Sequence, residues 1–449
     1  MRTKLIVSIT VAVLIASMVA FMRPAYADPD MVIKDLIAGG GNPASAIDVG
    51  DITVWNDLDN LYVKYDITEE DWYLTETHLA VATDLDEIPQ TKKGNPIPGQ
   101  FEYSTIHDPP VTEYTYTIPL EWDVDATLYI AAHAKVVKLI GDCASWQWAT
   151  EVIDFKQGTL VGGGEITDPA RTDPSKALGP PDGDFYSLGF VSDGDGYIEL
   201  GFGYPVYNGL NPDVRTIEIT WGRSAYPEER ANVYVWPKGG TSWIYIGTVT
   251  NHDSSDGSSY VNIPEGVTIV EKIKLVDATD KANFPPTQYP TADGFDLDAV
   301  GVHYLLEAEE TAWGDGIQFP GENWATYFTY KVQGWNVEGD WVIRVYYGKT
   351  YDHDFTFSAV QNGGTFTGTG GYPAGGPPYS IVEVVNGTVS GNIIKFHSVY
   401  IDPSTGLPTG YYWDAVGTIA PDGTMSGTWT SSTGQSGNWE SISGAATWE

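Results

Sequence analysis

Short runs of alternating apolar and polar residues, separated by Gly, Pro, Asn and Asp, make up the chain after its first 30 residues. Residues 51–55, 60–65 and 231–236 are examples, and each is rich in Val, Ile, Tyr, Thr or Trp. A period of two puts one side of a strand in a core and the other in water, and helical periodicity is nearly absent. The sequence therefore predicts an all-β chain of antiparallel sandwiches and barrels.

The first residues read as an export signal. Arg2 and Lys4 give a positive start, residues 5–21 are almost wholly apolar, and Ala-Tyr-Ala at 25–27 matches the small-x-small pattern of signal peptidase. We expect a cleaved signal helix, although an uncleaved anchor has a similar apolar length. No later stretch is apolar enough to span a bilayer, so we expect a secreted, extracellular protein without membrane insertion after cleavage. Association with the cell surface would then come from its own binding.

Composition and turn signals divide the rest of the chain into three tandem domains. Gly162-Gly163-Gly164 reads as a linker near the start of the second. The last piece contains eight short runs joined by turns such as Asn362-Gly363 and Asp422-Gly423, which predicts an eight-stranded antiparallel barrel. The predicted boundaries are 1–27 for the signal peptide, 28–157 for a β-sandwich of unknown role, 158–307 for a second sandwich and 308–449 for the barrel.

The charge balance excludes several classes of partner. The chain has 60 Asp and Glu against 23 Lys and Arg, a formal net charge of −37, which becomes −40 without the three basic residues of the signal. This charge divides into −17, −13 and −10 over the three predicted domains, so the acidic residues are spread over the whole mature chain. Nucleic acids and anionic membranes bind clustered Lys and Arg, so neither is expected as a partner.

The second domain carries motifs in an order that suggests a known type of fold. A loop Asp-Pro-Ser-Lys-Ala-Leu-Gly-Pro-Pro-Asp-Gly-Asp fills 173–184, and the strand-like segments that follow are 196–200, 217–221, 231–235, 243–247 and 294–300. This layout resembles the discoidin-type, galactose-binding-like jelly rolls of prokaryotic secreted and cell-surface proteins. The resemblance covers about a third of the chain and implies a jelly roll that binds glycan or another cell-surface component. The loop is longer here than in the usual discoidin form.

The same resemblance implies a structural calcium site. In galactose-binding-like folds a structural calcium often joins an early loop to the last strand, and Asp182, Asp184 and Asp298 would then be its ligands. Calcium takes six to eight oxygen ligands, which Asp/Gly loops can supply. The alternative is that these Asp and Gly residues simply form turns.

The third domain is similar to lipocalin and avidin-like barrels in its strand count and its Gly-x-Trp repeats at 427–429 and 437–439. No activity follows from that similarity. The interior of such a barrel could hold an apolar ligand or be filled by side chains.

Aromatic residues of the second domain are the candidates for a ligand site. Sugars stack their C–H faces on Trp and Tyr rings, and the candidate residues are Trp221, Tyr226, Trp236 and Trp243. The alternative is core packing, which the sequence favours for a strand residue such as Trp221.

Motifs for catalysis are missing from the sequence. It contains no Gly-x-Ser-x-Gly, His-Glu-x-x-His or P-loop pattern, and a single cysteine, Cys143. His78, His107 and His133 lie in the first domain, and two or three of them could meet on one sheet face to bind zinc. Glu76 or Glu113 would then complete the site, although a structural role is favoured. We therefore expect a non-enzymatic glycan-binding protein. The alternatives are a structural or adhesive protein that acts through protein–protein contacts, and a secreted hydrolase.

Overall fold

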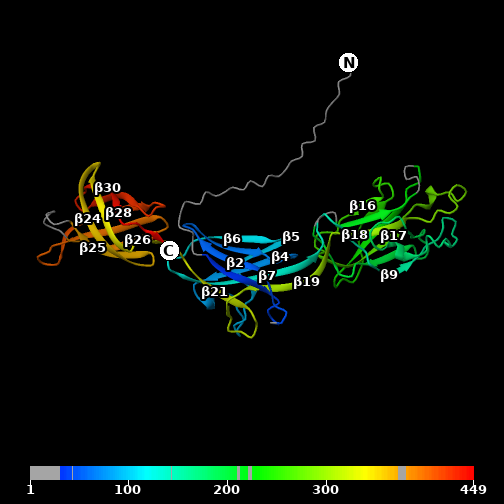
Figure 1. The fold of residues 1–449 in the computed structure, drawn as a ribbon, viewed down its shortest axis with the longest axis horizontal. Helices are drawn as coiled ribbons and strands as arrows, with labels where there is room; N and C mark the ends of the chain where they lie inside the picture. The colour runs from blue at the N-terminus through cyan, green and yellow to red at the C-terminus, as the bar shows by residue number, and fades with distance from the viewer. Residues whose placement is uncertain (1–30, 43, 143, 210–212, 221–224, 373–380) are drawn as a thin grey trace, which may run out of the picture.

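The protein is an all-β molecule in three β units, as the sequence predicts. The computed structural model describes residues 31–449 except 43, 143, 210–212, 221–224 and 373–380, so the predicted signal peptide 1–27 lies outside the described residues. Figure 1 shows the eight-stranded barrel at one end, a sandwich in the middle and a jelly roll at the other end. Helical structure among the described residues is limited to short 3-10 turns at Leu85–Glu87, Pro98–Gln100, Pro174–Ala177 and Lys281–Asn283.

The central sandwich is built from two segments of the chain, β1 to β7 and β19 to β21, which are separated in the sequence by the jelly roll. Its core lies between β1-β2-β3-β6 and the layer of β4, β5, β7, β19 and β21. Alternation places Val54, Leu61 and Val63 in this core, all with 0% exposure. The strands are β1 (Val32–Ala38), β2 (Ile47–Asn56), β3 (Asn60–Ile67), β4 (Trp72–Ala82), β5 (Tyr103–Val111), β6 (Glu113–Pro119), β7 (Thr127–Ile140), β19 (Tyr304–Gly314), β20 (Ile317–Gln318) and β21 (Thr326–Lys331).

The jelly roll is inserted between β7 and β19 of the sandwich. One of its layers contains β15-β14-β17 with β11, β12 and β9, and the other contains β8, β10, β18, β13 and β16. The strands are β8 (Gln147–Trp148), β9 (Glu151–Lys156), β10 (Tyr186–Ser187), β11 (Tyr197–Gly201), β12 (Val206–Tyr207), β13 (Val214–Glu218), β14 (Arg230–Pro237), β15 (Ile244–Thr250), β16 (Ser258–Val261), β17 (Ile269–Asp277) and β18 (Asp296–Val302).

The predicted domain boundaries differ from the strand pairing in two places. The boundary at 307 and 308 falls inside β19, which pairs with β1 and β7 of the sandwich. The boundary at 157 and 158 separates β9 from its partner β11 in the jelly roll. Composition and turn signals cannot reveal these pairings, because they connect residues far apart in the sequence.

The barrel closes on itself as an antiparallel up-and-down barrel of eight strands, β23 to β30. A two-stranded sheet of β22 and β31 joins its last residues to the linker that follows the sandwich. The strands are β22 (Trp335–Asn336), β23 (Gly339–Tyr347), β24 (Thr350–Asn362), β25 (Thr365–Gly371), β26 (Ile381–Ser390), β27 (Ile393–Ile401), β28 (Pro408–Ile419), β29 (Met425–Ser431), β30 (Ser436–Ser443) and β31 (Thr447–Trp448).

Large aromatic side chains fill the barrel core. Phe396 contacts Trp413 and Trp439 at ring-centroid distances of 5.4 and 5.3 Å, and all three are buried. The Trp439 ring fits because Gly417 and Gly427 lie beside it, where an added Cβ would collide with the ring. The core is therefore packed with protein side chains, which agrees with the filled alternative for small barrels.

Candidate functional site: a lysine–aromatic sheet face

The outer face of the larger jelly-roll layer carries a cluster of aromatic and charged side chains. Strand β17 alternates, so that Ile273 and Leu275 are buried in the core while Lys272 and Lys274 lie on the opposite face. In the strand pairing, Glu199 of β11 lies opposite Lys274, and Trp236 of β14 lies opposite Lys272. We call the set Tyr197, Glu199, Trp236, Trp243, Lys272 and Lys274 the lysine–aromatic face.

Cation–π contacts hold the two ammonium groups of this face. The Lys272 Nζ lies 4.9 Å from the ring centroid of Trp243 and 5.4 Å from that of Trp236. The Lys274 Nζ lies 3.9 Å from the Tyr197 ring and 5.3 Å from the Trp243 ring. Such contacts contribute about 0.5–1 kcal/mol each at exposed sites and more when desolvated, so they fix the long lysine chains in place.

One buried carboxylate connects the two lysines. Glu199 accepts a hydrogen bond of 2.6 Å from Lys272 and one of 3.2 Å from Lys274, and its side chain is 8% exposed. At the neighbouring edge, the Tyr197 hydroxyl donates to Asp154 of β9 at 2.8 Å. The face thus presents aromatic rings, ammonium donors and carboxylate acceptors within one layer of strands.

The structure brings together two of the four aromatic residues predicted for ligand binding. Trp236 and Trp243 are half-buried neighbours with ring centroids 5.3 Å apart and planes at 75°. Tyr226 lies elsewhere, where its ring packs against Phe284 and Tyr289 at 5.6 Å. Trp221 lies outside the described residues. The sequence analysis did not single out Tyr197, Glu199, Lys272 or Lys274, although the alternation of β17 could have placed the lysines on the outer face.

The predicted calcium ligands do not converge as a ligand set. The Asp298 carboxylate accepts hydrogen bonds from the backbone N–H groups of Asp182 and Gly183, at 3.2 and 3.1 Å. Asp184 instead forms an ion pair with Lys176 at 3.6 Å. Within the part of the chain that the structure describes, no group of three or more His, Cys, Asp and Glu side chains is placed to hold a metal ion. The Asp298 carboxylate therefore holds the 182–184 turn through its backbone N–H groups, and the calcium site stays a prediction from the resemblance.

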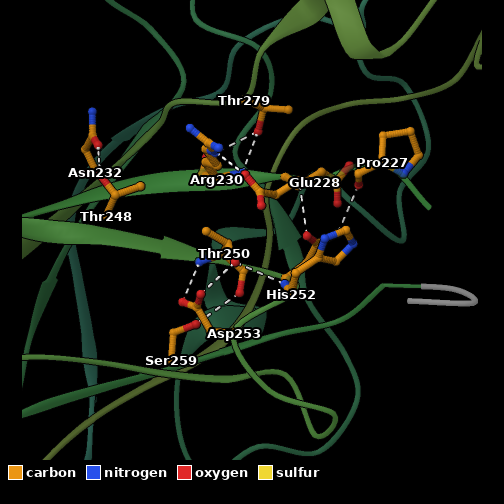
Figure 2. A network of polar contacts seen from close by, with 12 residues as sticks. Pro227, Glu228, Arg230, Asn232, Thr248, Thr250, His252, Asp253, Ser259 and Thr279 are labelled. Atoms are coloured by element: carbon orange, nitrogen blue, oxygen red, sulfur yellow. Dashed lines mark hydrogen bonds and ion pairs between the residues drawn. The ribbon is translucent and has the colours of Figure 1, made fainter. Parts of the chain in front are cut away.

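A polar network holds the loops at one end of the jelly roll (Figure 2). The backbone N–H of Arg230 donates a hydrogen bond of 2.9 Å to the Thr279 hydroxyl oxygen. This bond joins β14 to the loop after β17. Asp253 accepts hydrogen bonds from the backbone N–H and the hydroxyl group of Thr250, at 3.0 and 2.8 Å. The Arg230 bond, together with one of 3.0 Å from the Glu229 backbone N–H to the Asn251 side-chain oxygen, positions the segment that contains Glu229.

Five carboxyl groups are buried near that end. Arg171 forms ion pairs with Asp293 at 2.8 Å and Asp296 at 3.3 Å. Burial, reinforced by the charges of the neighbouring acids, raises the pKa values of the Glu229 and Asp296 carboxyl groups well above the usual range of a carboxyl group. The five buried acids are Glu218, Glu229, Asp277, Asp293 and Asp296.

The histidines considered for zinc do meet, but as packed side chains. His78 lies directly opposite His133 across β4 and β7, with ring centroids 5.3 Å apart. His78 Nε2 lies 2.9 Å from Glu76, whose other oxygen pairs with Lys135. Burial lowers the pKa of His133 to about 3, so that ring is neutral at physiological pH. The buried Nδ1 atoms of both rings have no hydrogen-bond partner among the described residues, so the choice between a structural histidine pair and a zinc site stays a prediction.

Comparison with known protein families, with curated proteins and with solved structures found no match to this chain. The similarities to discoidin-type domains and to lipocalin and avidin-like barrels therefore stay predictions from the sequence. None of the helical segments within the described residues has the length and apolar character needed to cross a bilayer.

Proposed function

We propose that the protein is a secreted, non-enzymatic glycan-binding protein, and that the lysine–aromatic face of its jelly roll is the binding surface. The observation that carries this proposal is the cluster of Tyr197, Trp236 and Trp243 around two lysines that share the buried Glu199. A sugar has an apolar C–H face and a rim of hydroxyl groups. Indole and phenol rings suit the first, and charged donors and acceptors suit the second.

The hydrogen-bonding capacity of the face supports this reading. An ammonium group has three N–H donors, and a carboxylate can accept several hydrogen bonds. Lys272 and Lys274 each give one hydrogen bond to Glu199, so each keeps donors for a bound hydroxyl group. Tyr245, which is 53% exposed, lies opposite Tyr234 in the β14–β15 pairing and extends the aromatic surface.

The same contacts support binding rather than hydrolysis. A glycosidase needs two carboxyl groups across the scissile bond, one of them as a proton donor. On this face the carboxylate of Glu199 is held by two ammonium groups. A carboxylate held in this way serves to position the lysines.

The proposal is tested by glycan-array binding followed by calorimetry on the exported chain. We expect Trp243→Ala to weaken binding by at least tenfold, which corresponds to about 1.4 kcal/mol, because it removes both a stacking surface and the support of Lys272 and Lys274. Trp55→Ala is the matched control, since Trp55 is a half-buried tryptophan on the central sandwich, stacked on Tyr62 at 5.1 Å. Unchanged glycan binding by folded Trp243→Ala would contradict the proposal.

A further inference from the structure

The outer face of the smaller jelly-roll layer carries a second cluster of aromatic rings around a cation. In the strand pairing, Arg215 of β13 lies opposite Tyr260 of β16 on one side and opposite Gly301 of β18 on the other. Trp148 of β8 lies opposite Gly301 in the same row, and Trp146 also lies against this glycine. We call the set Trp146, Trp148, Arg215 and Tyr260 the arginine–aromatic face. We infer that it is a second glycan-binding site, for neutral sugar chains, an inference that rests on the proposed glycan binding.

The side chains of this face point away from the jelly-roll core. In β13, Val214 and Thr216 are fully buried, whereas the Arg215 side chain between them is 20% exposed. In β16, Tyr260 is 50% exposed while its neighbour Ser259 is buried. The lysine–aromatic face lies on the outer side of the other layer, and the core lies between the two layers. The two faces therefore point in opposite directions, so one molecule can bind two separate glycan chains.

The guanidinium group of Arg215 is fixed in place but keeps hydrogen-bonding capacity. Its central carbon lies 5.8 Å from the ring centroids of both tryptophans and 6.0 Å from that of Tyr260. Nε and one terminal nitrogen donate hydrogen bonds of 3.1 and 2.7 Å to the Ser258 hydroxyl oxygen, and that terminal nitrogen lies 3.7 Å from Asp256. The other terminal nitrogen has no hydrogen-bond partner among the described residues, so its two N–H groups remain for a ligand.

The charges around this face favour a neutral ligand. Arg215 and Asp256 cancel, and two further acids, Asp142 and Asp213, interact electrostatically with His303, whose ring stacks on one of the tryptophans at 3.9 Å. Even a protonated His303 would leave these groups without an excess of positive charge, so an anionic ligand gains no net attraction. A cationic ligand is disfavoured as well, because the guanidinium group already occupies the cation position between the rings.

A sugar matches what the face presents. Its apolar C–H side can pack on the exposed Tyr260 ring, while its hydroxyl groups bind the free guanidinium nitrogen and the 64% exposed Asp256 side chain through charge-assisted hydrogen bonds. The rings of Trp146 and Tyr260 are tilted by 42° with centroids 6.0 Å apart. Because they do not form one flat platform, they suit a single chain rather than the surface of a crystalline polysaccharide. The alternative is that the rings only hold Arg215 within the sheet, and the experiment separates the two roles.

The experiment counts binding sites by calorimetry on the full exported chain, with neutral tetrasaccharides of glucose, galactose and mannose as probes. We expect two sites per chain. Tyr260→Thr, which keeps strand propensity, should weaken one of them about tenfold or more, and Tyr260→Phe should retain it because the ring remains. Trp243→Ala should weaken only the other site. Tyr204→Ala is the matched control, since Tyr204 is a 45% exposed tyrosine of the jelly roll outside the arginine–aromatic face.

The outcomes distinguish this inference from the proposed function. Two unchanged sites in folded Tyr260→Thr, with or without a lower melting temperature, would overturn the inference. A single site in the wild type that Trp243→Ala weakens would also overturn it and leave the proposed function standing. A single site that Tyr260→Thr weakens and Trp243→Ala leaves intact would support the arginine–aromatic face and remove the lysine–aromatic face. If Tyr260→Thr does not fold, Arg215→Lys keeps the charge but loses the planar guanidinium group, and it should weaken the same site. Binding of no glycan by the wild type would overturn both proposals.

Discussion

Asp277, at the end of β17, is a residue whose surroundings make folding depend on pH. Its carboxyl group is buried, accepts hydrogen bonds from the Thr279 hydroxyl and the Phe295 backbone N–H, and has its pKa raised to about 6, mainly by burial. The folded state therefore holds the proton more tightly than the unfolded chain. The stabilisation is fully present below pH 4 and is lost as pH rises to about 6.

We expect Asp277→Asn to reduce the pH dependence of jelly-roll stability. For a group that moves from a pKa of 3.8 to about 6, the free energy of unfolding falls by about 3 kcal/mol across that range. Asparagine carries no titrating proton, so this contribution should disappear, and urea unfolding of the variant between pH 4 and 7 measures the change. Glu271→Gln, an exposed position on the same strand, should keep the wild-type slope. An unaltered slope in Asp277→Asn would show that the carboxyl group titrates normally.

Single residues also mark the limit of what the sequence could predict about the site. Trp236 and Trp243 flank the turn between two predicted strands, so local alternation was enough to place them together. Tyr226 lies in the loop that leads into β14, and its packing against Phe284 and Tyr289 depends on tertiary contacts that no local pattern reveals. Asp298 was correctly connected to the 182–184 loop, but its partners are backbone N–H groups.

Among the elements, β28 and β29 show how the barrel accommodates its large core. Gly417 and Gly427 pair across these strands, and their missing side chains leave space for the Trp439 ring. The sequence predicted eight strands from its turns, and the closed barrel confirms this prediction. It could not predict which glycines were needed for packing, because a Gly-rich strand looks the same whether or not an aromatic ring lies beside it.

We expect Gly417→Ala to destabilise the barrel. The new methyl carbon would lie 2.4 Å from a ring carbon of the buried Trp439 and 2.4 Å from the Ser426 backbone oxygen, so one of them must shift. Overpacking of this kind costs roughly 1–3 kcal/mol, and thermal unfolding followed by tryptophan fluorescence measures it. Gly162→Ala is the control, since an added Cβ there has no heavy atom within 4 Å. Equal melting temperatures for Gly417→Ala and the wild type would mean that the ring can shift.

For the whole molecule, the sequence established the fold class and the number of β units but not their connection. Each unit forms from local hairpins and alternation, which are visible in the sequence. The pairing of β1 with β19 joins Leu36 to Gly314, across the whole of the jelly roll. No composition shift marks that pairing, because both strands look like ordinary members of neighbouring domains. The predicted tandem order is therefore correct for the barrel, whereas the central sandwich encloses the jelly roll in sequence.

Because the jelly roll is inserted in the sandwich, the residue at which the chain is truncated decides whether the sandwich can fold. A chain that ends at residue 307, the predicted boundary, loses most of β19 and all of β21, two strands that pair with the central strand β7. It also exposes the core faces that Ala312 and Phe328 cover in the intact sandwich. We expect this chain to have an unfolded sandwich that proteases cleave, whereas a chain that ends at residue 333 keeps both strands and stays folded. Limited proteolysis with mass spectrometry compares the two, and equal resistance of both would refute the importance of β19 for the sandwich.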